Sequence, residues 1–117
     1  MLSFPAHTCV YLCTASVDLR KSFDGLGGLV ESVFQRDVLD GHLFLFLNKR
    51  RDRVKALWWD RDGLAIWYKR LERGTFETPG ARGDAQHLEL DATELAMLLG
   101  GVSLASMKRR KRFAVGC

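Results

Sequence analysis

The sequence lacks an uninterrupted apolar run of the roughly 20 residues that a helix needs to cross a bilayer. Residues 1–5 also lack the positively charged start, followed by an apolar stretch, that a secretory signal would have. Cysteine is scarce, and Cys9, Cys13 and Cys117 form no even disulfide framework. These absences predict a cytoplasmic protein with no membrane partner.

The motifs of several enzyme classes are also absent. The sequence has no P-loop and no GxSxG nucleophile motif. Cys9 and Cys13 lack the tight spacing and the fourth ligand of a typical zinc site. A metal-dependent nuclease would need carboxylates such as Asp60 and Asp62, but these two residues are better explained as parts of a hairpin turn. We therefore expect no catalytic residues, no metal and no cofactor, and a nuclease is the weakest alternative.

The charge is modest in sum but unevenly distributed. Eighteen Lys and Arg residues against fourteen Asp and Glu residues give a formal net charge of +4. Basic residues cluster at 49–51, 69–73 and 108–112. Such an excess permits a polyanionic partner without requiring one. For the 117 residues we expect one compact domain over 1–107 and a disordered basic tail over 108–117.

The first part of the chain predicts a strand and a long helix. Residues 8–14 are β-branched and aromatic, which is typical of a strand. Residues 16–18 offer side-chain acceptors for a helix start, and apolar residues follow at helical spacing to about Gln35. Gly25, Gly27 and Gly28 lie inside this stripe and indicate either a neighbouring backbone that lies close or a break in the helix.

The second part predicts a series of hairpins. Strands are expected at 42–47, 53–59 and 64–71, because short polar turns separate these alternating runs. A short strand is expected at 87–90. Asp91 and Glu94 have capping-box spacing and open a short helix that ends at Gly100. The predicted fold class is α+β, an antiparallel β-meander of about four or five strands with one long helix packed on it and a short C-terminal helix.

The register of the second hairpin can be predicted from its turn. If Trp59 faces Leu64, then Arg53 faces Arg70, and every second pair between them shares that face. The opposite face carries Val54, Ala56, Trp58, Ala65, Trp67 and Lys69, and is the more apolar. We expect this second face to form the core and the first to present a free surface of basic and aromatic side chains.

Three stretches together resemble one known family. They are DLRKSFDGL at 18–26, LWWDRDG at 57–63 and WYKRLERG at 67–74. In this order they are similar to the accessory proteins, usually called TnpB, that the second open reading frame of insertion sequence 66 elements encodes. The resemblance covers about residues 8–100 and implies a role in transposition beside a separate, larger transposase. The family motif draws attention to Arg20, Lys21, Asp24, Arg53, Lys55, Trp58, Trp59, Asp60, Trp67, Tyr68, Lys69, Arg70 and Arg73.

The functional hypothesis is a non-catalytic accessory protein of DNA transposition that binds insertion-element ends. Cations neutralise phosphates, and flat side chains stack on exposed bases. An alternative is a protein-interaction module that docks on the transposase or self-associates as a homo-oligomer without contacting DNA. The tryptophans can also simply be core residues, and the charges a solvated edge. The candidate binding residues are Arg20, Lys21, Arg50, Arg51, Arg53, Lys55, Trp59, Arg61, Tyr68, Lys69, Arg70, Arg73, Lys108, Arg109, Arg110, Lys111 and Arg112.

Overall fold

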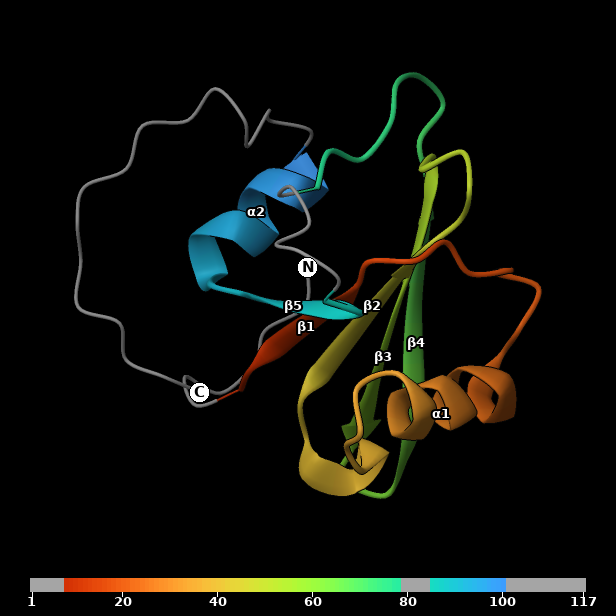
Figure 1. Ribbon diagram of the computed structural model, residues 1–117, viewed down its shortest axis with the longest axis vertical. Coiled ribbons are helices and arrows are strands. Elements are labelled where there is room, and N and C mark those ends of the chain that lie inside the picture. Colours follow the sequence, from red (N-terminus) through yellow and green to blue (C-terminus); the bar gives the residue numbers. More distant parts are fainter. Residues whose placement is uncertain (1–7, 79–84, 101–117) are drawn as a thin grey trace.

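The structure, a computed structural model, describes residues 8–78 and 85–100. Its elements, in chain order, are β1 (Val10–Cys13), α1 (Phe23–Ser32), the 3-10 helix η1 (Val38–Asp40), β2 (Leu43–Leu47), β3 (Arg53–Asp60), β4 (Gly63–Arg70), β5 (His87–Leu90) and α2 (Ala92–Gly100). The strands form one five-stranded sheet in the order β4-β3-β2-β1-β5 (Figure 1). The predicted α+β class is confirmed.

The sheet is mixed rather than antiparallel throughout. β2, β3 and β4 form the predicted antiparallel meander. β1, however, pairs with β2 in parallel, and β5 pairs with β1 in antiparallel fashion. The prediction of a purely antiparallel sheet is therefore wrong. The cause lies in the connection between β1 and β2, because a link that contains a helix can return the chain to the end of the sheet where β1 began.

The predicted register of the β3–β4 hairpin is confirmed over its whole length. The pairs run from Arg53 opposite Arg70 to Trp59 opposite Leu64 without a bulge. Two residues, Arg61 and Asp62, close the turn, and Arg61 has the positive φ of 58° that tight hairpin turns require. This continuous register fixes which side chains share a face.

Each face of the sheet carries a buried cluster, so the face predicted to be free is largely covered. It stays open only at one end of the β3–β4 hairpin, where Arg53, Tyr68 and Arg70 are exposed. The fully buried run LFLFL of β2 alternates between two clusters, as expected for a strand covered on both sides. The cluster on the α1 side contains Tyr11, Phe44, Phe46 and Leu57 with Leu26, Val30 and Phe34. The cluster on the α2 side contains Leu43, Leu45, Leu47, Val54, Ala56 and Phe76 with Leu98. Figure 1 shows the two helices on opposite sides of the strands.

The long helix predicted from residues 16–18 onwards is shorter than expected. α1 begins at Phe23, because the preceding segment crosses the end of the sheet instead: the Val17 N–H donates to the Leu47 carbonyl at 2.8 Å. Val17 and Leu19 lie in this segment, and their side chains are buried in the same cluster as those of α1. They therefore continued the apolar pattern of the helix in the sequence although they are not helical. The Asp18 carboxylate accepts the Arg20 backbone N–H at 3.0 Å, a local bond that competes with helix formation.

The glycines of α1 do not mark a break or a close backbone. The helix runs continuously through Gly25, Gly27 and Gly28. A Cβ atom at Gly27 or Gly28 would meet nothing within 4 Å, and one at Gly25 would meet only the Lys21 side chain. The two interpretations of these glycines from the sequence, a neighbouring backbone that lies close and a break in the helix, are therefore wrong.

The predicted capping box at the start of α2 is confirmed. The Glu94 N–H donates to the Asp91 carboxylate at 2.7 Å, and the Asp91 N–H donates to the Glu94 carboxylate at 3.1 Å. These reciprocal bonds satisfy two donors that the first turn of a helix leaves open. α2 is thereby anchored directly after β5.

Candidate functional site

A hollow lies at the end of the sheet where β2 finishes and β3 begins. Its volume is about 520 Å³. It is formed by the segment before α1, the turn between β2 and β3, and the last residues of β4. It is lined by Ser16, Val17, Asp18, Leu19, Arg20, Asn48, Lys49, Arg50, Asp52, Arg53 and Tyr68, and we call it the basic hollow.

The β2–β3 turn presents two of these cations through a fixed backbone. The Asn48 side chain accepts the Arg53 N–H at 3.0 Å and donates to the Asp52 carboxylate at 2.6 Å. The Arg51 N–H donates to the Asn48 carbonyl at 3.1 Å, and Arg51 has a φ of 58°. Lys49 and Arg50 therefore project from a turn that Asn48 closes on itself. Within the described residues, neither of them makes an ion pair.

A tyrosine forms one wall of the hollow. Tyr68 is 48% exposed, unusually open for so large a side chain. Its hydroxyl accepts a hydrogen bond from Arg53 Nη1 at 3.2 Å, and the Lys55 ammonium lies 4.9 Å from its ring centroid. Lys55 itself is buried and donates to the Lys21 carbonyl at 2.8 Å. Lys55 thus supports the ring from within, whereas Arg53 and Tyr68 remain accessible.

The two carboxylates of the hollow are already paired. Asp18 accepts several hydrogen bonds from Arg20, the shortest at 2.6 Å, and these lower the pKa of Asp18 to about 2. The same bonds raise the pKa of Arg20. The Asn48 amide lowers the pKa of Asp52 by a side-chain hydrogen bond. Four cations (Arg20, Lys49, Arg50 and Arg53) against these two carboxylates leave an excess of two positive charges in the hollow.

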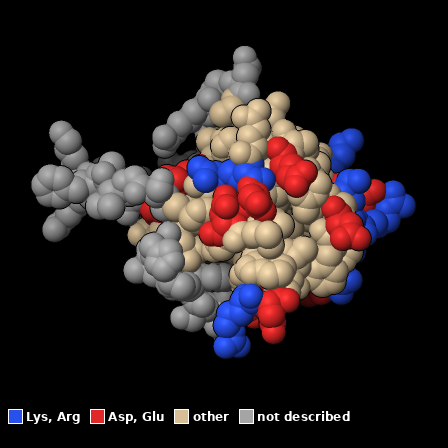
Figure 2. Space-filling model, turned by 90° about the horizontal axis from the view of Figure 1, so that it is seen from below, with Lys and Arg blue, Asp and Glu red and all other residues tan. Residues whose placement is uncertain are grey.

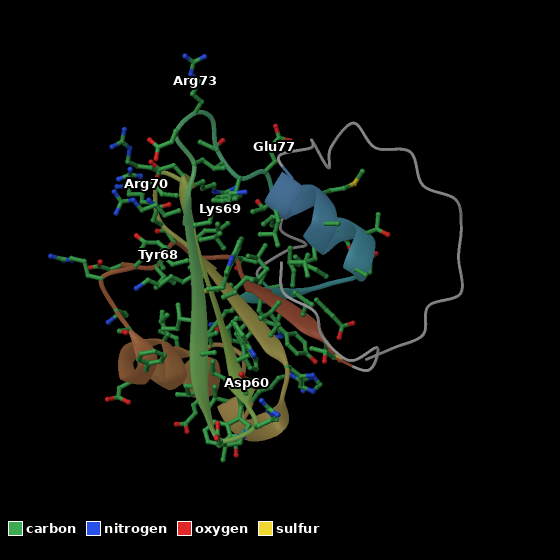
Figure 3. All side chains as sticks on the ribbon, turned by 180° about the vertical axis from the view of Figure 1, so that it is seen from behind. Asp60, Tyr68, Lys69, Arg70, Arg73 and Glu77 are labelled. Atoms are coloured by element: carbon green, nitrogen blue, oxygen red, sulfur yellow. The ribbon has the colours of Figure 1, made fainter. Side chains whose placement is uncertain are left out.

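Charge is separated along the sheet. Near the hollow, Arg70 and Arg73 add to the cations, with Glu72 paired to Arg70 at 2.9 Å. Figure 3 shows Tyr68, Lys69, Arg70 and Arg73 at one end of β4, and Asp60 at the other. We call the first the basic end. The opposite end holds the β3–β4 turn with Asp60, Arg61 and Asp62, and η1 with Asp37 and Asp40, and we call it the acidic end. Figure 2 views this end, where acidic groups lie among basic ones.

Most of the predicted binding residues meet at the basic end. Arg53 lies opposite Arg70, and Lys55 opposite Tyr68. Arg51 lies beside the hollow and donates to the Thr78 hydroxyl at 2.8 Å. The predicted residues placed there are Arg20, Lys21, Arg50, Arg51, Arg53, Lys55, Tyr68, Arg70 and Arg73.

Other predicted residues lie apart from this group. Arg61 is in the turn at the acidic end, and Trp59 is half-buried two residues before it. Lys69 lies at the basic end, but it is exposed on the other face of the sheet from Tyr68 and Arg70, because side chains alternate along a strand. The tail cations Lys108, Arg109, Arg110, Lys111 and Arg112 lie outside the described residues.

The tryptophans do not form a stacking platform. Trp58 and Trp67 pack against the cluster on the α2 side, as the predicted register requires, and none of Trp58, Trp59 and Trp67 is fully exposed. Their role is mainly packing. The open aromatic ring of the site is Tyr68.

Sequence reasoning missed several residues that line the hollow. Asn48 and Asp52 flank the turn between β2 and β3, which we call the basic turn, and a side-chain hydrogen bond joins them. Their spacing in the sequence could have predicted this closed turn, but attention went to the cations between them. Ser16 and Lys49 also line the hollow but were not among the proposed binding residues. Ser16 offered no signal, since only the crossing of its segment over the sheet brings it there.

The part of the chain that the structure describes contains neither a grouped set of metal-binding side chains nor a membrane-spanning helix. No three His, Cys, Asp or Glu side chains in 8–78 and 85–100 are grouped so that they could bind a metal ion. In the same ranges, no helix has the length and apolar character needed to span a membrane.

The fold and the site define a small α+β protein whose cations gather at one end of its sheet. The family model for IS66 Orf2 like proteins matches residues 8–109. The chain belongs to this family, and it is a transposition-associated accessory protein, as the three sequence stretches had indicated.

Two relatives come from Sinorhizobium fredii (strain NBRC 101917 / NGR234), and both are described as uncharacterized. Protein y4hO is 33% identical over 102 residues, which cover 87% of each chain. Protein y4jC is 33% identical over 101 residues, which cover 86% of this chain and 85% of the relative. No solved structure matches.

Proposed function

We propose that the protein binds DNA of the insertion element through its basic end and catalyses no step itself. The observation that carries this proposal is the basic hollow, which four cations (Arg20, Lys49, Arg50 and Arg53) line together with one accessible tyrosine, Tyr68. In this role the protein positions DNA for the transposase, which carries out the strand chemistry.

The electrostatics of the hollow suit a phosphate backbone. Lys49 and Arg50 are exposed, so binding an anion does not require breaking an ion pair of the described residues. Arg53 is oriented by its hydrogen bond to Tyr68, which reduces the side-chain entropy lost on binding. Contacts of this kind give affinity and register but no sequence specificity.

The Tyr68 ring offers a surface for stacking on a base. Paired bases inside a duplex are already stacked on one another, so unpaired bases use this surface better. An accessible ring among cations can stack on an unpaired base, and each such stack contributes about 1–3 kcal/mol. The proposal therefore includes a preference for element ends that contain unpaired bases over fully paired duplex of the same length.

The test is titration of labelled element-end DNA with the full chain at several salt concentrations. The logarithm of affinity should fall linearly with the logarithm of salt concentration, by about 0.9 for each phosphate neutralised on duplex DNA. The double variant Arg50→Ala, Arg53→Ala should bind more weakly and reduce this slope by about 2. Arg61→Ala is the matched control, because it removes an exposed arginine at the acidic end.

Two outcomes would contradict the proposal. One is the absence of a complex at low salt. The other is an equal loss of affinity for Arg61→Ala and for a single change in the hollow, which would mean that net charge rather than the site determines binding.

A second candidate function is docking on the transposase. The observation that favours it is the Arg53–Tyr68 pair, because partly exposed tyrosine and arginine are the residue types that dominate the energetics of protein interfaces. Tyr68→Ala should then reduce co-purification with the transposase in nuclease-treated extract, while DNA binding by the purified chain stays unchanged. Loss of DNA binding together with retained co-purification would favour the first function.

A further inference from the structure

The sheet ends in a long open strand. β4 is the outermost strand of the sheet and, among the described residues, pairs only with β3. It has eight residues in continuous register, with no proline and no bulge. Natural proteins usually protect such an edge by bulges, prolines or covering segments, because an open edge is a template for further pairing. Figure 3 shows β4 in front, with α1 to one side of it.

One backbone hydrogen bond at the end of β4 defines which backbone groups of the strand are open. The Leu71 N–H donates to the Asp52 carbonyl at 2.7 Å, so the pair next to Arg53 and Arg70 is a hydrogen-bonded one. Hydrogen-bonded and non-hydrogen-bonded pairs alternate in an antiparallel ladder. The N–H and C=O groups of the even-numbered residues therefore point away from β3. These residues are Leu64, Ile66, Tyr68 and Arg70.

The two ends of β4 carry opposite charges. The strand begins beside Asp60, Arg61 and Asp62, which carry a net negative charge. It ends at Lys69 and Arg70, which outweigh Glu72, the ion-pair partner of Arg70 at 2.9 Å. A second copy placed antiparallel along this edge would bring the acidic start of one strand to the basic end of the other. Lys69 and Arg70 would repel a parallel copy of themselves, but they attract the antiparallel one.

We propose that the protein self-associates through β4, with two copies joined edge to edge into one continuous ten-stranded sheet. A twofold axis perpendicular to the sheet keeps each face on its own side, so opposed residues must both be even-numbered or both odd-numbered. The register that satisfies the charges places Ile66 opposite Ile66 of the partner. Leu64 then lies opposite Tyr68, and Asp62 lies beside Arg70 at each end.

The side chains of the edge suit this arrangement. Leu64 and Ile66 are only partly buried by the cluster on the α1 side, so apolar surface remains available at the edge. Opposed apolar and aromatic pairs stabilise antiparallel strands. A shift that opposed even-numbered to odd-numbered residues would put side chains on the wrong face. Among the registers that remain, the two Asp62–Arg70 contacts per dimer select this one. This inference rests on the unpaired edge of β4 and not on DNA binding. The two sites share Tyr68 and Arg70, so the dimer is measured on protein that is free of DNA.

The experiment measures mass and amide exchange on the purified full chain, free of DNA. Sedimentation over a range of concentrations should show a species of twice the 13.2 kDa of the chain. As the dimer forms, the amides of Leu64, Ile66, Tyr68 and Arg70 should gain protection from hydrogen exchange. The amides of Ala65, Trp67 and Lys69 face β3 and should be protected at every concentration.

Charge exchange tests the register. Asp62→Arg and Arg70→Asp should each weaken the dimer by about tenfold, because each turns two attractive contacts into repulsive ones. The double variant Asp62→Arg, Arg70→Asp restores opposite charges and should recover most of the affinity. Asp40→Arg is the control, since it makes the same change of charge on η1, away from the edge, and should leave the dimer unchanged.

Three outcomes would overturn the proposal. They are a chain that stays monomeric at every concentration, a dimer in which the even-numbered amides of β4 gain no protection, and single reversals that leave the dimer as stable as the Asp40→Arg control. Failure of DNA binding with a dimer of the stated exchange pattern would contradict the proposed function alone.

Discussion

Arg53 and Tyr68 are diagonal neighbours on adjacent strands, and the arginine donates a hydrogen bond of 3.2 Å to the tyrosine hydroxyl. The contact arises from register: Lys55 lies opposite Tyr68 and Arg53 opposite Arg70, so all four side chains share one face. Their order along the strands also separates their roles. Lys55 is buried beneath the ring, whereas Arg53 and Tyr68 reach the basic hollow.

The Tyr68 ring should matter more than its hydroxyl for single-stranded DNA. Tyr68→Ala removes the stacking surface and should weaken binding of a short single strand by about 1–3 kcal/mol. Tyr68→Phe keeps the ring, loses only the bond from Arg53, and should retain most of the affinity. Fluorescence anisotropy on one labelled oligonucleotide gives both values. Equal affinities of the wild type and Tyr68→Ala would rule out stacking.

The Lys55 ammonium should stabilise the fold rather than bind a partner. Lys55→Met keeps the shape of the stem but leaves the Lys21 carbonyl without its donor at 2.8 Å. The expected loss is about 1–3 kcal/mol in the free energy of unfolding, since an orphaned acceptor in a partly buried site is costly.

Lys69→Met is the matched control for Lys55→Met. It changes an exposed lysine on the same hairpin and should alter the free energy of unfolding by less than about 0.5 kcal/mol. Urea unfolding of both variants is the measurement. If the two variants lost the same stability, the bond to Lys21 would contribute nothing.

The Asp18–Arg20 pair should be visible in the pH dependence of the carboxyl group. Hydrogen bonds from Arg20 lower the pKa of Asp18 to about 2, so the folded chain favours the ionised form. This stabilisation is present above the unfolded pKa of about 3.9 and is lost as the pH falls through about 2. Titration of the Asp18 carboxyl carbon by NMR measures the shift.

Two substitutions separate the causes of this shift. Arg20→Gln removes the largest contribution, the side-chain hydrogen bonds, and should return the pKa of Asp18 close to its ordinary value. Lys21→Gln removes only the weakest contribution, a nearby charge, and should change the pKa far less. A larger effect of Lys21→Gln would show that the pair does not form in solution.

Much of the local structure could be predicted from the sequence. The β3–β4 register followed from one turn and strict alternation, and Asp91 with Glu94 gave the start of α2. The pairing of strands that are far apart in the sequence could not be predicted from turns and alternation. Nothing in the short run Val10–Cys13 indicates that β1 pairs in parallel with β2, and a buried LFLFL run does not reveal which helix covers which side.

The sequence predicted which segments contribute to the candidate site better than it predicted where their side chains lie. Runs of Lys and Arg identified the right segments, but they did not show that Lys55 points inward or that Arg61 lies at the acidic end. Leu19 shows a different cause of error. It lies in the extended segment before α1, and its side chain is buried in the same cluster as the apolar side chains of α1. Its spacing from them therefore resembled the apolar face of a helix although Leu19 is not helical. Tertiary contacts, rather than local propensity, determined these outcomes.

The conformation of the basic turn should control DNA affinity without any change of charge. Asn48→Ala removes the bond to the Arg53 N–H and the bond to the Asp52 carboxylate, and should cost about 1–2 kcal/mol of stability. It should also weaken DNA binding, because Lys49 and Arg50 lose their fixed positions. The salt dependence should keep its slope, since no cation is removed.

A second variant separates the two bonds of Asn48. Asn48→Asp keeps the acceptor for the Arg53 N–H but places a second carboxylate beside Asp52. It should therefore lose stability mainly at pH values above the pKa values of the two acids. Urea unfolding and DNA titration on the same samples test this, and an Asn48→Ala chain with unchanged DNA affinity would show that the turn does not position the cations.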